Sequence, residues 1–418
     1  MKKLPKSEGV KQTTITFIGN IGSAGISALA LILISRILGP KLFGEFSAGF
    51  AIIMILNKIN DAGIAVAMQK YVGGSSNHTD AGEYLSISLR FKLTITILIL
   101  LITLPFSNYL TNLFNFSSPY IVPISILLGT SIVYYEFLQS ALQSLHLFSS
   151  AVIINATQAS IKLIAAISIF TFHSKELLPI YTLFIAAPMV PLVLAKKLIP
   201  KSVTISLKNL SVKKTKQMVS IAKHSALLII AAAVIDYIGI LFVQRYLTSF
   251  ETGLLGGVSR ISLMFTLIGV SLAQVLNPRV ARYKNKEDIS TFIRKAFIIA
   301  GASILGFFVV IPFAKLSILL TIGNQYIQGY PVLIVLLASV FVYVASVPFS
   351  ALFFSFKEPS YFSISGILQI ITIVLGNFLF VPTYGLMATA WTQLVTRVIT
   401  LVFTLIFALI AYKKEYSE

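Results

Sequence analysis

Seven ionisable side chains lie inside stretches of sequence that are otherwise apolar and long enough to cross a membrane. Four are cations and three are acids: Lys58, Lys162, Arg260, Arg397, Asp61, Glu136 and Asp236. A charge at the middle of a membrane-spanning helix costs about 2.5–3.5 kcal/mol on insertion scales, so each group is expected to face a cavity or a partner. The surplus of cations predicts a slightly basic interior. Its ammonium and guanidinium groups could offset the desolvation cost of an anionic substrate by charge-assisted hydrogen bonds.

The charges of the first half allow both a structural and a functional interpretation. Lys58 and Asp61 are three residues apart on one helical face and could simply neutralise each other. Glu136 is close to the end of its span and could reach the membrane interface. Lys162 lies deep in its span with no charged residue within one helical turn, so the sequence leaves its role open.

The charges of the second half leave the same choice. Asp236 could form an ion pair with Arg260, or it could bind a proton or a cation that drives a transport cycle. Arg260 and Arg397 each lie in the middle of an apolar span, which favours a cavity. We therefore expect one group to line a substrate cavity, namely Lys58, Lys162, Arg260 and Arg397. The three acids are the candidates for binding a coupling ion, namely Asp61, Glu136 and Asp236.

Few residues suggest catalysis, a metal or a cofactor. The four histidines lack the spacing of metal ligands, cysteine is absent, and no G-x-x-x-x-G-K-[ST] loop is available to bind ATP phosphates. The only adjacent acids are Glu287 and Asp288. A membrane glycosyltransferase or polymerase, the alternative from another class, needs a carboxylate cluster instead. The sequence therefore predicts a protein that is not an enzyme and holds no metal or cofactor.

Bulk composition indicates which elements carry these charges. Of 418 residues, 56% are hydrophobic and 11% are charged, whereas soluble domains carry about 25% charged residues. No charge occurs in 93–135, 316–356 or 359–396, and each gap of roughly 40 residues fits two membrane-spanning helices. The alternating polarity of barrel strands is absent. The net charge of +19 comes from lysine clusters between apolar runs, which indicates cytoplasmic loops rather than a nucleic-acid surface.

The hydrophobic pattern predicts an all-α polytopic membrane protein with about twelve transmembrane helices. The most polar stretch, 196–223, holds eight lysines and no acid. It predicts a basic cytoplasmic linker over 200–220 between two six-helix bundles, at 1–199 and 221–418. The expected spans are 14–35, 43–67, 86–106, 119–140, 147–172, 177–198, 221–244, 253–276, 293–314, 330–354, 360–381 and 384–411.

The distribution of lysine and arginine predicts which side of the membrane each loop faces. With the N-terminus in the cytoplasm, only five of the 33 basic residues fall in outside loops: Arg36, Lys41, Lys175, Arg245 and Lys315. Positive residues concentrate on the cytoplasmic side of membrane proteins. The imbalance therefore predicts that both termini are cytoplasmic.

The two halves share a short pattern. Arg36 and Gly44 recur half a chain length later as Arg245 and Gly253, with a leucine two residues after each arginine. Both copies come directly after the first helix of a bundle. Duplicated halves are a common plan among transporters, with the substrate site between them. The pattern therefore predicts two pseudo-symmetric six-helix bundles around a central cavity.

Residues 35–46, which read S-R-I-L-G-P-K-L-F-G-E-F, resemble a segment of the polysaccharide exporters and O-antigen flippases of the Wzx type, R-x-L-G-P-x-x-[YF]-G-x-[YF]. Residues 61–64 resemble the D-x-G-[LI] at the end of that family's second helix. Residues 382–390 resemble its P-x-Y-G-x-x-G-A-A segment, with Ala388-Thr389-Ala390 as a departure from G-A-A. The resemblance covers nearly the whole chain, and most of its motifs are structural.

The resemblance implies the architecture of the multidrug/oligosaccharidyl-lipid/polysaccharide exporter superfamily. It implies a flippase that carries an undecaprenyl-diphosphate-linked oligosaccharide, such as an O-antigen repeat of lipopolysaccharide, across the bacterial inner membrane by alternating access. The expected partners are this substrate, membrane lipid, a driving proton or sodium ion and other polysaccharide assembly proteins, with no nucleic acid. The alternative within the superfamily is an ion-coupled exporter of drugs or cations, for which a net acidic cavity is expected.

Overall fold

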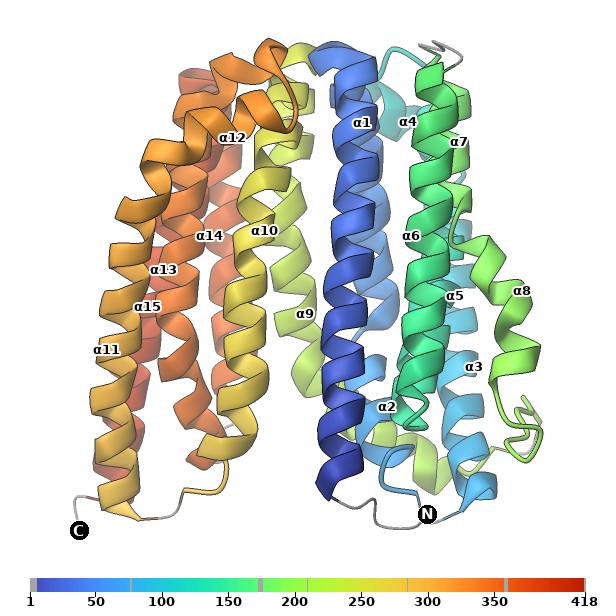
Figure 1. The fold of residues 1–418 in the computed structure, drawn as a ribbon, viewed down its shortest axis with the longest axis vertical. Coiled ribbons are helices and arrows are strands. Elements are labelled where there is room, and N and C mark those ends of the chain that lie inside the picture. Colours follow the sequence, from blue (N-terminus) through green and yellow to red (C-terminus); the bar gives the residue numbers. More distant parts are fainter. Residues whose placement is uncertain are drawn as a thin grey trace. The chain divides into compact units, whose positions relative to one another are not determined.

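The computed structural model of the chain describes residues 6–75, 77–171, 176–208, 210–283, 285–356 and 360–416. Lys175, one of the basic residues predicted in outside loops, lies outside these ranges. Nearly every described residue belongs to a helix, and none of them belongs to a strand. The chain divides into two compact units (Figure 1), unit 1 with Met1–Leu38 and Gly49–Ile230, and unit 2 with Gly39–Ala48 and Ala231–Glu418.

Unit 1 contains most of the helices of the first half of the chain. They are α1 (Lys6–Asp61), α2 (Ile64–Tyr71), α3 (His78–Thr103), α4 (Ser107–Leu113), α5 (Ile121–Ser144), α6 (Phe148–Thr171), α7 (Leu177–Ala186), α8 (Met189–Leu198) and the first part of α9 (Val212–Tyr246). Among them, α5 packs against α2, α3, α6, α7 and α8, so it forms the centre of this unit.

Unit 2 contains the rest of α9 and the helices that follow it. They are α10 (Ser249–Val280), α11 (Lys286–Val310), α12 (Ala314–Leu320), α13 (Tyr330–Ser355), α14 (Ser360–Tyr384) and α15 (Leu386–Tyr416), with 3₁₀ turns at Ile311–Phe313 and Asn324–Gly329. Helix α13 packs against α10, α11 and α15. Its sequence is apolar on every side, as expected for a helix surrounded by other helices.

Eleven helices in the described ranges are long and apolar enough to cross a membrane. The first of them, Gly22–Asp61, has 40 residues, about twice the length that one crossing needs. It is broken at Gly39, where φ is 67°, and Pro40 follows without the N–H that a continuing helix requires. Counting the two parts of this helix separately gives twelve crossings. The predicted fold class and the break between the first two spans are therefore confirmed.

The second predicted span, 43–67, is too long. Helix α1 ends at Asp61 because Ala62 and Gly63 have positive φ angles of 40° and 79°. A side chain at Gly63 would overlap the backbone oxygen of Ala222, so the close approach of these two segments requires glycine. The D-x-G-[LI] segment therefore ends one helix and starts α2.

The pattern shared by the two halves marks a close helix crossing within unit 2. Here residues 39–48 of α1 lie against the start of α10. A Cβ at Gly44 would overlap the backbone of Ser249, and a Cβ at Gly253 would overlap the backbone of Pro40. Small residues allow such backbone approach between membrane helices. The two matching glycines therefore have a packing role.

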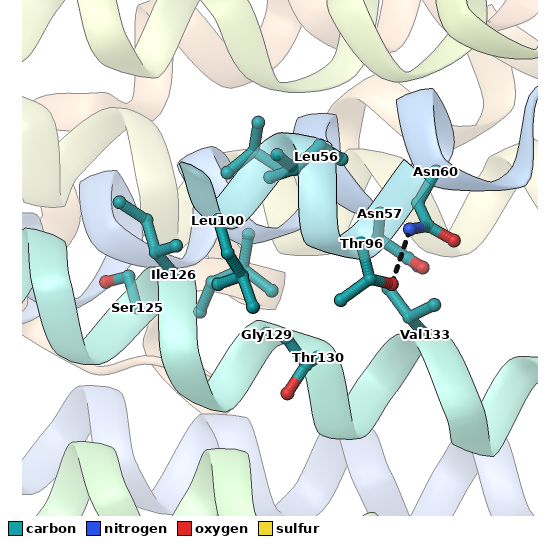
Figure 2. A pocket seen from close by; sticks show the side chains of 12 residues that line it. Leu56, Asn57, Asn60, Thr96, Leu100, Ser125, Ile126, Gly129, Thr130 and Val133 are labelled. Atoms are coloured by element: carbon teal, nitrogen blue, oxygen red, sulfur yellow. Dashed lines mark hydrogen bonds between the residues drawn. The ribbon is translucent and has the colours of Figure 1, made fainter. Parts of the chain in front are cut away.

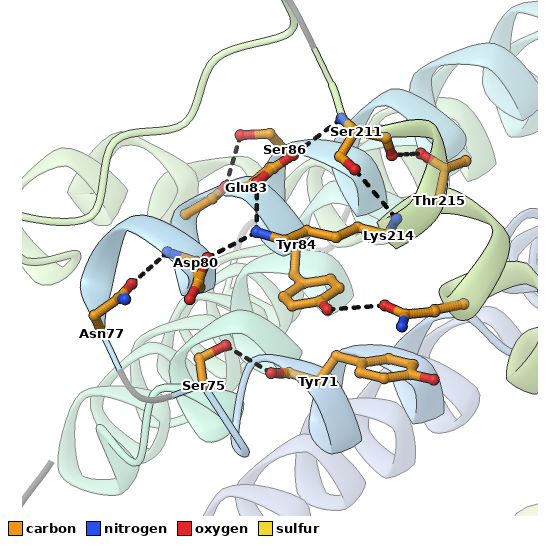
Figure 3. Close-up of polar contacts among 12 residues, drawn as sticks. Tyr71, Ser75, Asn77, Asp80, Glu83, Tyr84, Ser86, Ser211, Lys214 and Thr215 are labelled. Atoms are coloured by element: carbon orange, nitrogen blue, oxygen red, sulfur yellow. Dashed lines mark hydrogen bonds and ion pairs between the residues drawn. The ribbon is translucent and has the colours of Figure 1, made fainter.

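The basic segment after α8 is packed along the start of α3 (Figure 3). Its apolar residues Val203, Ile205 and Leu210 join a core cluster of unit 1. Lys214 Nζ lies 2.7 Å from Asp80 Oδ1 and 2.5 Å from Glu83 Oε2. Helix α9 already begins at Val212, and the change from unit 1 to unit 2 falls after Ile230. The boundaries predicted at 199, 200–220 and 221 remain predictions.

Candidate functional site

Polar side chains from three helices converge in the interior of unit 2. Asp236 is on α9, Asn377 is on α14, and Thr389 and Arg397 are on α15. Gly239, one helical turn after Asp236, allows this convergence. A Cβ at Gly239 would overlap the methyl group of Thr389 and would lie 3.5 Å from Asn377 Oδ1. The absence of a side chain at this glycine thus brings the three helices together.

Asp236 faces a cation at a distance that is too long for a hydrogen bond. Its Oδ1 lies 3.7 Å from Nη2 of Arg397, whereas charge-assisted N–H···O bonds measure about 2.7–2.9 Å. The side chains of Asp236 and Arg397 are 27% and 12% exposed. The structure therefore shows a loose ion pair with Arg397, and Arg260, the partner suggested from the sequence, also attracts the carboxylate.

Three oxygen atoms here are shielded from solvent and have no hydrogen-bond partner among the described residues. They are Asp236 Oδ1, Asn377 Oδ1 and Thr389 Oγ1. Asn377 Nδ2 donates to the carbonyl oxygen of Ile373 at 2.7 Å, which turns its Oδ1 towards Gly239. A cavity of ≈10 Å³ is lined by Asp236, Gly239 and Thr389.

This set of atoms suits a small hard cation or a proton. Buried polar atoms in proteins nearly always have partners, so these three oxygens are candidates for binding a ligand. Carboxylate, amide and hydroxyl oxygens are the ligands that hard cations prefer. The carboxylate of Asp236 could alternatively take up a proton, which would remove its charge and leave a donor for a neighbouring oxygen.

The two arginines of unit 2 lie over tyrosine rings. Cζ of Arg397 lies 4.8 Å from the ring centre of Tyr343 on α13, and Cζ of Arg260 on α10 lies 5.9 Å from the ring centre of Tyr237 on α9. The negative face of an aromatic ring attracts a cation at such distances. The planar guanidinium also carries several N–H donors that can bind an anion in bidentate fashion.

The charges predicted in unit 1 form ion pairs at hydrogen-bond distance. Lys58 Nζ lies 2.8 Å from Glu136 Oε2, and Lys92 Nζ lies 2.9 Å from Asp61 Oδ1. The Lys92 and Asp61 side chains are 1% and 8% exposed, and the Lys58 and Glu136 side chains are 29% and 27% exposed. The sequence had paired Lys58 with Asp61, whereas the structure gives each of them a partner on another helix.

Lys162, on α6, lies over an aromatic ring. Its Nζ is 4.9 Å from the ring centre of Phe184 on α7. Of the seven predicted residues, four therefore belong to unit 1, namely Lys58, Asp61, Glu136 and Lys162. Three belong to unit 2, namely Asp236, Arg260 and Arg397. Their predicted roles in binding substrate or a coupling ion remain predictions.

Three residues of these clusters were not identified from the sequence. Lys92 follows Arg90 near the start of a predicted span, so it resembles an ordinary cytoplasmic lysine. Asn377 and Thr389 carry no charge, and single uncharged polar residues are common in membrane helices. A usable signal for Thr389 was its position in the segment that departs from the family's G-A-A.

Comparisons with known proteins agree on a family and on a fold. The family model described as "Polysaccharide biosynthesis protein" matches residues 10–283. No curated protein sequence matches the chain closely enough to count as a relative. An inward-facing multidrug resistance MATE family transporter of the MOP superfamily is similar, with a TM-score of 0.80 and 14% identity, over 94% of this chain and 95% of that chain.

Two further solved structures support the same fold. Lipid II flippase MurJ in an inward closed conformation has a TM-score of 0.74 at 13% identity, over 96% of this chain and 90% of that chain. A MOP superfamily transporter from Pyrococcus furiosus has a TM-score of 0.69 at 16% identity, over 99% of both chains. At such identities the likeness shows the fold, which is that of MOP-superfamily transporters. Since the family model covers more than half of it, this multi-pass membrane chain belongs to the polysaccharide biosynthesis protein family.

Proposed function

We propose that the protein is a flippase that moves an undecaprenyl-diphosphate-linked oligosaccharide from the inner to the outer leaflet of the bacterial cytoplasmic membrane. The observation that carries this proposal is the match to the polysaccharide biosynthesis family on a chain with the fold of MOP-superfamily transporters. One of the similar structures is described as a flippase of lipid II. The mechanism would be alternating access, and the substrate would be an O-antigen repeat or a similar unit.

The intramembrane cations supply the chemistry for an anionic cargo. A diphosphate must leave water while it crosses, and guanidinium groups can replace that water with bidentate, charge-assisted hydrogen bonds. Arg397 and Arg260 lie over the rings of Tyr343 and Tyr237. Together with Lys162 they are the residues proposed to receive the diphosphate or acidic sugars.

Uptake of a proton or sodium ion at Asp236 is the proposed driving step. Without the ion, the carboxylate of Asp236 balances Arg397 across 3.7 Å. With a sodium ion held by the oxygens of Asp236, Asn377 and Thr389, or with a proton on Asp236, the carboxylate no longer neutralises Arg397. The guanidinium is then available to the anionic substrate, which links ion binding to substrate binding in one lobe.

The alternative within the same fold is an exporter of drugs or other cations. It is favoured by the likeness to a multidrug resistance MATE family transporter. A cationic cargo requires acidic groups, however, and the described charge cluster of unit 2 sets Arg260 and Arg397 against the single carboxylate of Asp236. That balance supports an anionic cargo.

A reconstituted system tests the function and the alternative together. Purified protein is placed in liposomes with a fluorescent undecaprenyl-diphosphate-linked oligosaccharide in the leaflet equivalent to the cytoplasmic one, and a proton or sodium gradient is imposed. We expect the labelled lipid to reach the opposite leaflet, with faster movement under one of the two gradients. Transport of a cationic dye without movement of the labelled lipid would establish the alternative.

A matched pair of variants tests the role of Asp236 in the same liposomes. Asp236→Asn should be present at normal levels and bind substrate, but its flux should no longer respond to the gradient. If Asp236 is only the structural partner of Arg397, the single variant is unstable and adding Arg397→Gln restores its stability. A stable Asp236→Asn protein whose flux still responds to the gradient would eliminate the coupling role.

Cysteine labelling tests the proposed orientation, in which both termini are cytoplasmic. The chain has no cysteine of its own, so single cysteines can be introduced directly. In intact cells, Ser117→Cys and Ser249→Cys should react with an impermeant thiol reagent, and Ser206→Cys and Ser290→Cys should not. The opposite pattern would invert the predicted topology.

A further inference from the structure

The transport cycle proposed above assigns no role to a small cavity in unit 1, which several polar side chains line in part. It lies between α1, α3 and α5 (Figure 2), has a volume of ≈20 Å³ and is lined by Asn57, Asn60, Thr96 and mainly apolar residues. A volume of about 10–15 Å³ is enough for one water molecule. The cavity therefore has room for one small guest.

Asn57 determines what that guest must be. The residue is 1% exposed, and neither its Oδ1 nor its Nδ2 has a hydrogen-bond partner in the part of the chain that the structure describes. Because both atoms lack a partner, the observation holds whichever way the amide is turned. A buried amide in this condition is rare in proteins. The guest must therefore both donate and accept hydrogen bonds.

Asn60, three residues later on α1, supplies a second acceptor in a fixed orientation. Its Nδ2 donates to Thr96 Oγ1 at 2.8 Å, the bond drawn in Figure 2, and to the carbonyl oxygen of Lys92 at 3.3 Å. These bonds leave Asn60 Oδ1 buried and without a partner among the described residues. The nearby charges of Lys92 and Asp61 neutralise each other, so they do not require an ion in the cavity.

We propose that this cavity binds a single hydroxyl group, which accepts from Asn57 Nδ2 and donates to Oδ1 of Asn57 or Asn60. A hydroxyl combines a donor with acceptor lone pairs, as the two amides require. A metal cation would use the amide oxygens alone and would leave Asn57 Nδ2 unmatched. The hydroxyl comes from a water molecule or from a sugar of the transported oligosaccharide, and the second source rests on the proposed function.

The sign of a stability change tests whether the guest exists. Asn57→Leu is nearly isosteric and removes both polar atoms. We expect it to lower the melting temperature of the purified, substrate-free protein by about 2–4 °C, because the bonds to the hydroxyl are lost. A rise in melting temperature overturns the proposal, because replacing truly unpaired polar atoms by apolar ones stabilises a protein. Asn155→Leu is the matched control. Because Asn155 is hydrogen-bonded to Tyr135 and Asn20 within unit 1, its replacement should lower the melting temperature.

Added substrate distinguishes the two sources of the hydroxyl. Undecaprenyl-diphosphate-linked oligosaccharide should raise the melting temperature of the wild-type protein. If a sugar hydroxyl occupies the cavity, Asn57→Leu loses most of this rise, and if water occupies it, the rise is kept. A wild-type protein that shows no rise at all contradicts the proposed function, while the substrate-free comparison still decides the cavity.

If the Asn57→Leu protein does not accumulate, an experimental structure of the wild-type protein that resolves water molecules can show whether a hydroxyl group occupies the cavity. Density for one atom within hydrogen-bond distance of Asn57 and Asn60 supports the hydroxyl site. A cavity without such density, or an Asn57 amide bonded only to protein groups, overturns it.

Discussion

Units 1 and 2 both place charges inside membrane-spanning helices, but they pair these charges in different ways. In unit 1, Lys92 Nζ and Asp61 Oδ1 are 2.9 Å apart and almost fully buried. In unit 2, the corresponding distance from Arg397 to Asp236 is 3.7 Å, and Asp236 Oδ1 has no hydrogen-bond partner within the described residues. The first pair is closed, whereas the second still has atoms available for a ligand.

The difference shows which charges can change state during a transport cycle. Separating Lys92 from Asp61 would leave two unpaired charges in a medium of low dielectric constant, which is strongly unfavourable. At Asp236 we expect the cost of change to be lower, because Asn377 Oδ1 and Thr389 Oγ1 also lack hydrogen-bond partners among the described residues and are proposed to bind the incoming cation. We therefore propose a structural role for the unit 1 pair and a change of state during transport for the unit 2 pair.

The largest expected effect comes from breaking the closed pair. Lys92→Met leaves the Asp61 carboxylate buried without its cation, and removing one partner of a buried pair typically costs about 3–5 kcal/mol. We expect a marked loss of folded protein in the membrane, measured by size-exclusion chromatography after mild solubilisation. Adding Asp61→Asn to Lys92→Met should restore most of the yield, because no unpaired charge then remains.

Lys58→Met is the matched control for this prediction. Its pair with Glu136 has a similar length of 2.8 Å, but the two side chains are 29% and 27% exposed. Exposed pairs contribute about 0–1 kcal/mol, so the yield should change little. An equal loss in both variants would mean that burial does not distinguish the two pairs.

The second effect concerns the open site of unit 2. Asn377→Leu and Thr389→Val each remove one oxygen, and each should weaken binding of the driving ion by roughly tenfold if a lost ligand costs about 1.4 kcal/mol. Flux at rising sodium concentration or falling pH in liposomes measures this change. Thr400→Val is the control, because the Thr400 hydroxyl on the same helix donates to Thr396 O at 2.7 Å. An unchanged ion dependence in both variants would show that the site is also structural.

A third and smaller effect is expected at the three proposed substrate-binding cations, where the contribution of the positive charge can be separated from that of the planar guanidinium. Lys162→Ala, Arg260→Ala and Arg397→Ala should each reduce surface polysaccharide while leaving the amount of protein near normal. Arg260→Lys and Arg397→Lys should recover part of the loss, since they keep the charge but lose the planar fork. Normal export by all three alanine variants would contradict the basic-cavity mechanism.

The sequence predicts the helices well because a long uncharged segment of about 20 residues in a membrane protein forms a membrane-spanning helix. Uncharged gaps fix the spans, and Gly39 and Pro40 mark a break that any helix would have there. The ends of spans are less certain, since Asp61 ends a helix in the middle of an apolar run through backbone angles at Ala62 and Gly63. Those angles depend on the approach of Ala222, more than 150 residues away.

The partners of the charges could not be predicted in the same way. Lys58 and Asp61 are neighbours on one helical face, yet their partners are Glu136 on α5 and Lys92 on α3. Which residues meet across helices depends on how each helix is rotated about its axis, and hydrophobicity along the chain does not fix that rotation. Neutral ligands such as Thr389 are harder still, because nothing in their type separates them from residues that only pack.

The smallest expected effect concerns the partly exposed ion pairs that Lys214 forms with Asp80 and Glu83 (Figure 3). Burial alone would lower the pKa of Lys214, but hydrogen bonds and attraction from the two carboxylates outweigh it and raise the pKa above its ordinary 10.5. A cation with a raised pKa stabilises the folded state fully below its ordinary pKa. This contribution is lost as the pH rises through the folded value.

Lys214→Met should therefore lower the melting temperature at neutral pH, by less than about 2 °C because the pair is near the surface. The difference from wild type should shrink above pH 10.5, where wild-type Lys214 begins to lose its charge. Lys213→Met, at an exposed neighbouring lysine, is the control and should have no effect at any pH. A difference for Lys214→Met that persists unchanged in strongly alkaline buffer would mean that the side chain acts through the packing of its methylene groups rather than through its charge.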